Sequence, residues 1–164
     1  MTTRAPLPKV GLFACFSGGS NTGSLAGMAA LEVVRRLGGD VVGVCSLPAV
    51  LNEVPRQSAT VKKIETVAVI DGCHQACARQ LLDRVGIRPA VYMNIETNLG
   101  IQKLGPFTSL SFTDEQVNAV ADALVTAIRQ SLRSQHDQNE APNVTSLVGG
   151  GESSENWSRS GHNR

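Results

Sequence analysis

Four cysteines are the residues in this sequence best suited to chemistry, and each stands at or just beyond the end of an apolar, strand-like run. They are Cys15, Cys45, Cys73 and Cys77. Thiolates bind soft metal ions and attack disulfides and other electrophiles. Four cysteines among 164 residues are too sparse for a disulfide scaffold. They predict metal or thiol chemistry in a reducing compartment, which we take to be the cytoplasm.

Alternating strand and helix patterns predict how these cysteines are positioned. Strands are expected over 10–16, 41–47, 66–70 and 90–95, and helices over 24–37, 56–63, about 73–85 and 113–133. This alternation predicts an α/β fold: a small, doubly wound, mainly parallel four-stranded sheet in the order 2-1-3-4 with flanking helices. Because parallel strands end at one edge of the sheet, Cys15, Cys45 and Cys73 would meet there. Cys77 would join them from the first turn of the second helix.

Composition limits the remaining functions. Residues 9–133 form one predicted domain, and the polar stretch 134–164 predicts a disordered tail. Fifteen Lys and Arg residues balance fourteen Asp and Glu residues, and 4% of the chain is aromatic, which argues against a nucleic-acid partner. No apolar run is long enough for a membrane span. A capping box, Thr113 with Gln116, is expected to begin the last helix.

Four converging thiolates suit a tetrahedral zinc site, or alternatively an iron–sulfur cluster. Such a zinc site would either be closed and structural or exchange a ligand for a small thiol or an anion. The second hypothesis is a metal-free thiol enzyme for redox or sulfur transfer, with Cys15 or Cys73 as a nucleophile at a helix N-terminus. Whether the protein is an enzyme stays open at this level, as does its oligomeric state.

Several neighbours of the cysteines are candidate site residues. The turn after the first strand could bind an anion at a helix N-terminus, or be a tight turn that ends in an N-cap. Its residues are Ser17, Gly18, Gly19, Ser20 and Asn21. Asp71, His74 and Lys103 are candidates for hydrogen bonds to the thiolates or for charge compensation. The alternatives are turn formation for Asp71 and solvent exposure for His74 and Lys103.

Three motifs carry a resemblance to a known family. They are Cys15-x-Ser17-Gly18-Gly19-Ser20-Asn21, Ile70-Asp71-Gly72-Cys73-x3-Cys77-Ala78 and Asn98-Leu99-Gly100-Ile101-x-Lys103. In this order they resemble the DGC-domain family, named for its Asp-Gly-Cys, over about residues 10–130. The resemblance implies a prokaryotic zinc-binding protein whose chelating cysteines correspond to Cys15, Cys45, Cys73 and Cys77. The chain departs from the family at Ser46-Leu47-Pro48, where a Gly-rich loop is usual, and at Glu96-Thr97-Asn98 before Leu-Gly.

Overall fold

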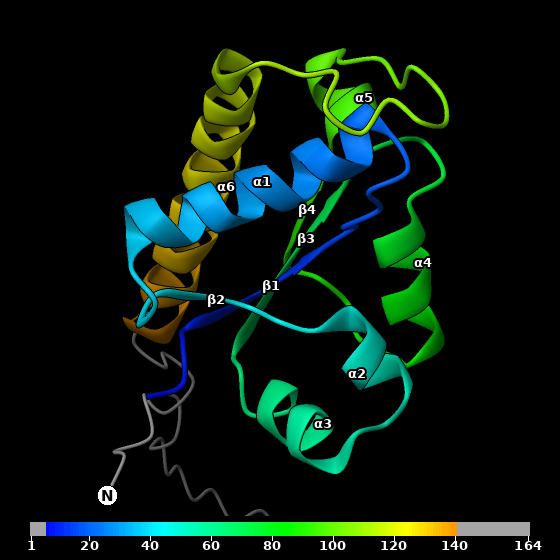
Figure 1. Ribbon diagram of the computed structural model, residues 1–164. Coiled ribbons are helices and arrows are strands. Elements are labelled where there is room, and N and C mark those ends of the chain that lie inside the picture. Colours follow the sequence, from blue (N-terminus) through cyan, green and yellow to red (C-terminus); the bar gives the residue numbers. More distant parts are fainter. Residues whose placement is uncertain (1–5, 141–164) are drawn as a thin grey trace, which may run out of the picture.

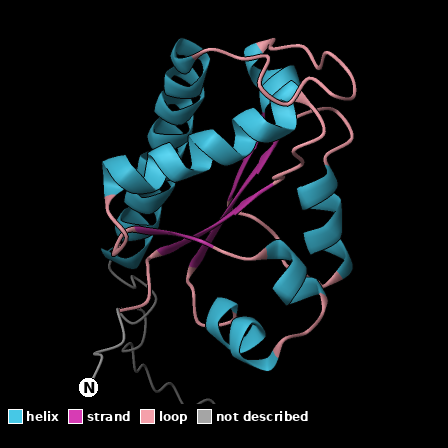
Figure 2. Cartoon of the chain, viewed as in Figure 1, coloured by secondary structure: helices cyan, strands magenta, loops and turns pink. Residues whose placement is uncertain are grey.

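A four-stranded sheet runs through the middle of the computed structural model, which describes residues 6–140 (Figure 1). Helices cover both faces of the sheet, and long loops gather at one of its ends (Figure 2). The elements in chain order are β1 (Val10–Ala14), α1 (Asn21–Leu37), β2 (Val42–Val44), α2 (Leu47–Leu51), α3 (Pro55–Val61), β3 (Thr66–Asp71), α4 (Cys77–Arg84), β4 (Val91–Asn94), α5 (Ile95–Leu99) and α6 (Asp114–Glu140).

The sheet has the order β2-β1-β3-β4, and its neighbouring strands are all parallel. This confirms the predicted α/β fold and its strand order. The central strand β1 pairs with β2 on one side and with β3 on the other, which requires helical crossovers between successive strands. The carboxyl ends of the strands therefore lie together at one edge of the sheet.

Two apolar layers enclose the sheet. Helices α1 and α6 pack on one face, and α2, α3 and α4 lie on the other (Figure 1). Along β1, Leu12 and Ala14 belong to the first layer, whereas Phe13 belongs to the second. Because side chains alternate along a strand, Cys15 faces the α4 side together with Phe13. This alternation places the Cys15 thiol on the face of the sheet that α4 covers.

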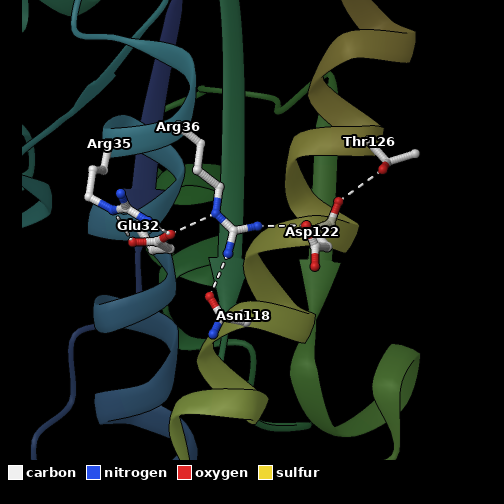
Figure 3. A network of polar contacts seen from close by, with 6 residues as sticks. All are labelled: Glu32, Arg35, Arg36, Asn118, Asp122 and Thr126. Atoms are coloured by element: carbon white, nitrogen blue, oxygen red, sulfur yellow. Dashed lines mark hydrogen bonds and ion pairs between the residues drawn. The ribbon is translucent and has the colours of Figure 1, made fainter.

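A polar network ties α1 to α6 at the surface (Figure 3). The guanidinium of Arg36 donates to Glu32 Oε1 at 2.7 Å, to Asp122 Oδ1 at 2.6 Å and to Asn118 Oδ1 at 2.6 Å. Arg35 also donates to Glu32 through two nitrogens. Hydrogen bonds from both arginines lower the pKa of Glu32 to about 2. The network stabilises the helix pair on the face opposite α4, so it leaves the cysteine-bearing edge free.

The second predicted helix begins later than its sequence pattern indicated. Helix α4 starts at Cys77, not at 73 or 74. Residues 73–76 form a turn in which Ala76 N donates to Cys73 O at 3.0 Å, and Ala76 adopts a left-handed conformation with φ of 47°. Cys73 and Cys77 therefore do not share one helical face. The predicted start of the helix at about residue 73 was wrong, although Cys77 does lie in its first turn, as predicted.

The chain also differs from prediction around its last two helices. Residues 95–99, expected as the end of a strand and a polar turn, form the short helix α5. Helix α6 continues to Glu140, so the predicted boundary at 133 fell too early, and the rest of the predicted tail lies outside the described residues. The capping box is confirmed: Gln116 N donates to Thr113 Oγ1, and Thr113 N donates to Gln116 Oε1. Within residues 6–140, no helix has both the length and the apolar character that crossing a membrane requires.

Candidate functional site

Three polar or reactive side chains form a row across the carboxyl ends of β1, β3 and β4. Asp71 pairs in register with Asn94. Cys15 follows the register pair Ala14–Ile70, and its amide donates to Ile70 O at 2.9 Å, so it stands beside Asp71. Neighbouring strands are about 4.8 Å apart, and residues in register point to the same face. Cys15, Asp71 and Asn94 therefore share the face that α4 covers.

Asp71 holds the beginning of α4. Its carboxylate accepts hydrogen bonds from Ala78 N at 2.8 Å and from Arg79 N at 3.0 Å. The residue at the usual capping position, Ala76, makes no side-chain hydrogen bond. Asp71, at the end of the preceding strand β3, thus caps the helix. Its negative charge also complements the positive end of the helix dipole. This contact fixes Cys77, the residue before Ala78, above the same end of β3.

The thiol of Cys15 is partly buried within this arrangement. Burial raises its pKa, and the nearby charges of Asp71 and Cys77 raise it further. Backbone N–H groups of Ser17 and Gly72 act in the opposite direction by stabilising the thiolate. Burial also raises the pKa of Asp71. At neutral pH, Cys15 is therefore a neutral thiol beside a carboxylate. When the thiolate forms, the amides of Ser17 and Gly72 can donate hydrogen bonds to it.

Cys45 occupies a different environment. Its amide donates to Leu12 O, which places it beside Phe13, two register positions before Cys15. Its Sγ lies 3.1 Å from where a Cβ on Gly11 would stand. The thiol is thus directed back along β1, away from the carboxyl edge, and the buried ring of Phe13 belongs to the same layer. Cys45 packs as a small apolar side chain in this part of the structure.

This position predicts the reactivity of Cys45. Burial raises the pKa of its thiol to about 11. Because the thiolate is the reactive form, alkylation of Cys45 by iodoacetamide is expected to stay slow from neutral pH until the pH approaches about 11. Mass spectrometry of the alkylated peptides measures this profile, with the exposed Cys77 as the internal control. Equal labelling of Cys45 and Cys77 at neutral pH would contradict the prediction.

Cys73 is buried and adjoins a polar group on β4. Its carbonyl accepts from Asn94 Nδ2 at 2.6 Å. The same Asn94 amide lies 3.4 Å from the hydroxyl of Tyr92. The guanidinium of Arg79 lies over the Tyr92 ring, 5.0 Å from its centroid. Asn94, Tyr92 and Arg79 were not among the sequence candidates, although strand alternation places Tyr92 and Asn94 on the face of Asp71.

The Ser17–Asn21 turn is held by the protein's own groups. Ser20 is the N-cap of α1, and its hydroxyl accepts from Gly23 N. The amide of Asn21 donates to Thr108 Oγ1 at 3.1 Å, and its side chain bonds to the backbone of 102 and 104. Gly19 O accepts from Phe107 N, and Gly18 O accepts from Ser109 Oγ. These bonds fit the alternative of a capped turn, and anion binding there stays a prediction.

His74 and Lys103 meet at Glu96 and not at the thiols. Glu96 Oε2 accepts from His74 N at 2.8 Å and lies 2.7 Å from His74 Nδ1. Lys103 N is 3.5 Å from Glu96 Oε1, and Lys103 Nζ donates to Gln75 Oε1 at 3.4 Å. Hydrogen bonds from His74 are the main reason that the pKa of Glu96 is lowered. These contacts connect the loop before α4 to the loop after α5.

The four cysteines are suitable zinc ligands by type, but the structure does not place them around one point. Within residues 6–140, no three His, Cys, Asp or Glu side chains are placed to hold one metal ion. Both oxygens of Asp71 accept backbone amides, and Cys45 points toward Gly11. Cys77 is near enough to Cys15 for its charge to raise the pKa of the Cys15 thiol, after burial and Asp71. The structure thus brings together Cys15, Asp71 and Cys77, while the four-cysteine site stays a prediction.

Comparison with known families agrees with the motifs around these residues. Residues 11–124 match the DGC domain, which spans β1 through the first part of α6. No significant match is found among curated proteins or among solved structures. The match covers more than half of the chain and includes all four cysteines. The chain therefore belongs to the DGC-domain family.

Proposed function

We propose that this protein is a dithiol, with Cys15 as the thiol that reacts first and Cys77 as its partner. The observation that carries the proposal is the position of Asp71 between them. Cys15 stands beside Asp71 on the adjacent strand. The carboxylate of Asp71 binds the amide of Ala78, the residue after Cys77. Cys77 is exposed and Cys15 partly so, which gives a co-reactant access to both.

The reaction we propose is thiol–disulfide exchange with a small disulfide. Cys15 transfers its proton to the Asp71 carboxylate, which has acceptor sites beyond the two that bind amides. The Cys15 thiolate then attacks one sulfur of the disulfide, whose S–S bond breaks and releases one thiol. The first leaving thiolate takes up the proton held by Asp71. Cys77 then loses its proton to the solvent, and its thiolate attacks the Cys15 sulfur. The mixed disulfide breaks, and the second small thiolate leaves and takes up a proton from the solvent. Two protein thiols are oxidised to a disulfide, and one small disulfide is reduced to two thiols.

Oxidation with neutral dithiodipyridine tests this proposal. We expect an intramolecular bond between Cys15 and Cys77, identified by peptide mapping without reduction. Cys15→Ser should abolish the fast phase of the reaction, and Cys77→Ser should stop it at a mixed disulfide on Cys15. The matched control is Cys45→Ser, which should form the same bond because Cys45 lies beside Gly11. A fast phase that survives Cys15→Ser, or a bond that uses Cys73, would refute the assignment.

Zinc binding by all four cysteines is the second candidate, and one observation favours it. The cysteines follow β1, β2 and β3, which are adjacent and parallel, so their backbones reach the same edge of the sheet. A tetrahedral site would require the turn between β2 and α2 to turn the Cys45 side chain away from Gly11. When bound, zinc would hold the cysteines as thiolates and keep them from other reactions.

Elemental analysis of protein purified without a metal-affinity tag distinguishes the two candidates. The dithiol proposal predicts that a chelator does not change the number of thiols that react. About one zinc per chain, with the thiols masked until chelation and the zinc lost in Cys45→Ser, would favour the metal site instead. Iron with acid-labile sulfide would assign the same cysteines to an iron–sulfur cluster.

A further inference from the structure

The first turn of α4 carries a cation, Arg79, two residues after Cys77. Its backbone amide donates to the Asp71 carboxylate. Burial raises the pKa of Asp71, and the charge of Arg79 acts against that rise. Asp71 is therefore the common neighbour of Cys15, of the start of α4 and of this cation.

The contacts of Arg79 leave part of its guanidinium available. Tyr92 covers one face at 5.0 Å, and Nε lies 3.3–3.4 Å from the carboxylate of Asp83. The two terminal nitrogens make no hydrogen bond to the described residues, and the side chain is 39% exposed. Asp83 is itself exposed, so it screens the cation weakly. A planar group with free donors is well suited to a carboxylate.

Tyr92 contacts this cation on the face of the sheet that α4 covers. Its ring is 37% exposed, and its hydroxyl accepts from Asn94, which also binds the carbonyl of Cys73. Burial and the Asp71 carboxylate raise the pKa of Tyr92, so the phenol adds no negative charge at neutral pH. The face of the sheet that α4 covers thus offers an aromatic ring and a cation.

We propose that Arg79 selects the disulfide that reacts with the dithiol, favouring a small disulfide that carries a carboxylate away from its reacting sulfur. The guanidinium binds that carboxylate, and the ring of Tyr92 supports the chain between carboxylate and sulfur. Arg79 is then a specificity-determining residue that takes no part in bond exchange. This inference rests on the proposed dithiol function and names the class of its co-reactant.

The test compares two disulfides of opposite character. Second-order rate constants are measured with the dianionic dithiobis(nitrobenzoate) and with the neutral dithiodipyridine, for the whole protein and its variants. We expect Arg79→Met to lower the rate with the dianion about threefold or more relative to the rate with the neutral reagent. Arg79→Lys should keep most of the rate because it keeps the charge. The effect should shrink at high ionic strength.

Arg84→Met is the matched control, because it removes one positive charge from the exposed, opposite end of the same helix. It should not change the ratio of the two rates. Equal losses with both reagents in Arg79→Met would mean that Arg79 acts by holding α4, and an unchanged ratio would mean that it binds no anion; either result overturns the inference. Failure of the dithiol itself is seen separately, as a fast phase with the neutral reagent that survives Cys15→Ser.

Discussion

Replacing Asp71 by Asn is expected to destabilise the protein and, at the same time, to make Cys15 more reactive. The stability effect follows from the two amides that the carboxylate accepts. Asn supplies one acceptor oxygen, and its NH2 group would face the second amide. A buried donor left without an acceptor costs about 1–3 kcal/mol. The helix start that Asp71 caps has no side-chain cap of its own to compensate, since Ala76 occupies the capping position.

The reactivity effect follows from charge. The Asp71 carboxylate is, after burial, the largest cause of the raised pKa of Cys15. A neutral Asn removes that repulsion, while the N–H donors of Ser17 and Gly72 continue to stabilise the thiolate. The fraction of thiolate at neutral pH therefore rises, and alkylation of Cys15 by iodoacetamide should accelerate several-fold. Exchange with a disulfide would gain from the same change but lose the group that accepts the thiol proton.

Both effects are measured on one preparation, by urea unfolding and by the rate at which the Cys15 peptide is alkylated. Asp83→Asn is the control, because it removes an exposed carboxylate from α4, the helix that Asp71 caps. It should change neither quantity appreciably. A slower alkylation of Cys15 in folded Asp71→Asn protein would mean that the carboxylate helps to form the thiolate at rest, contrary to the direction of the pKa shift.

The sequence was sufficient to predict the sheet because its signals are local and repeated. Continuous apolar runs identify buried parallel strands, and the Thr113–Gln116 pair identifies the start of α6. The strand order could be predicted because few arrangements satisfy right-handed crossovers, and the structure confirms it. The placement of Cys15 near the carboxyl edge followed from the same reasoning.

The details of the site depend on contacts between distant residues, and these could not be predicted from local patterns. The start of α4 is set by Asp71, six residues before Cys77, and by the left-handed Ala76. Cys45 was expected at the edge because its strand ends there, but Gly11 leaves room for its thiol further back on the neighbouring strand. Tyr92 joins the site only because β4 pairs with β3, a pairing that places it on the face of α4.

Replacing Gly72 by Ala is expected to cause a large loss of stability at this edge of the sheet. A Cβ at Gly72 would lie 2.5 Å from Thr22 O and 2.8 Å from Gly23 N. Both are backbone atoms in the first turn of α1, so no side-chain rotation can relieve the contact. Overpacking costs about 1–3 kcal/mol even where side chains can move, and we expect at least the upper part of that range here. The Gly72 amide, which stabilises the Cys15 thiolate, would shift with the turn.

Gly39→Ala is the matched control for this substitution. Gly39 has nothing within 4 Å of an added Cβ, and the same methyl group there should change the free energy of unfolding by no more than about 0.5 kcal/mol. Urea unfolding of the two variants compares them directly. If Gly72→Ala proved as stable as Gly39→Ala, the turn after β3 would have to be free to move away from α1. The arrangement of Cys15, Asp71 and Cys77 would then not be fixed by the fold, and the geometry that supports a dithiol would be lost with it.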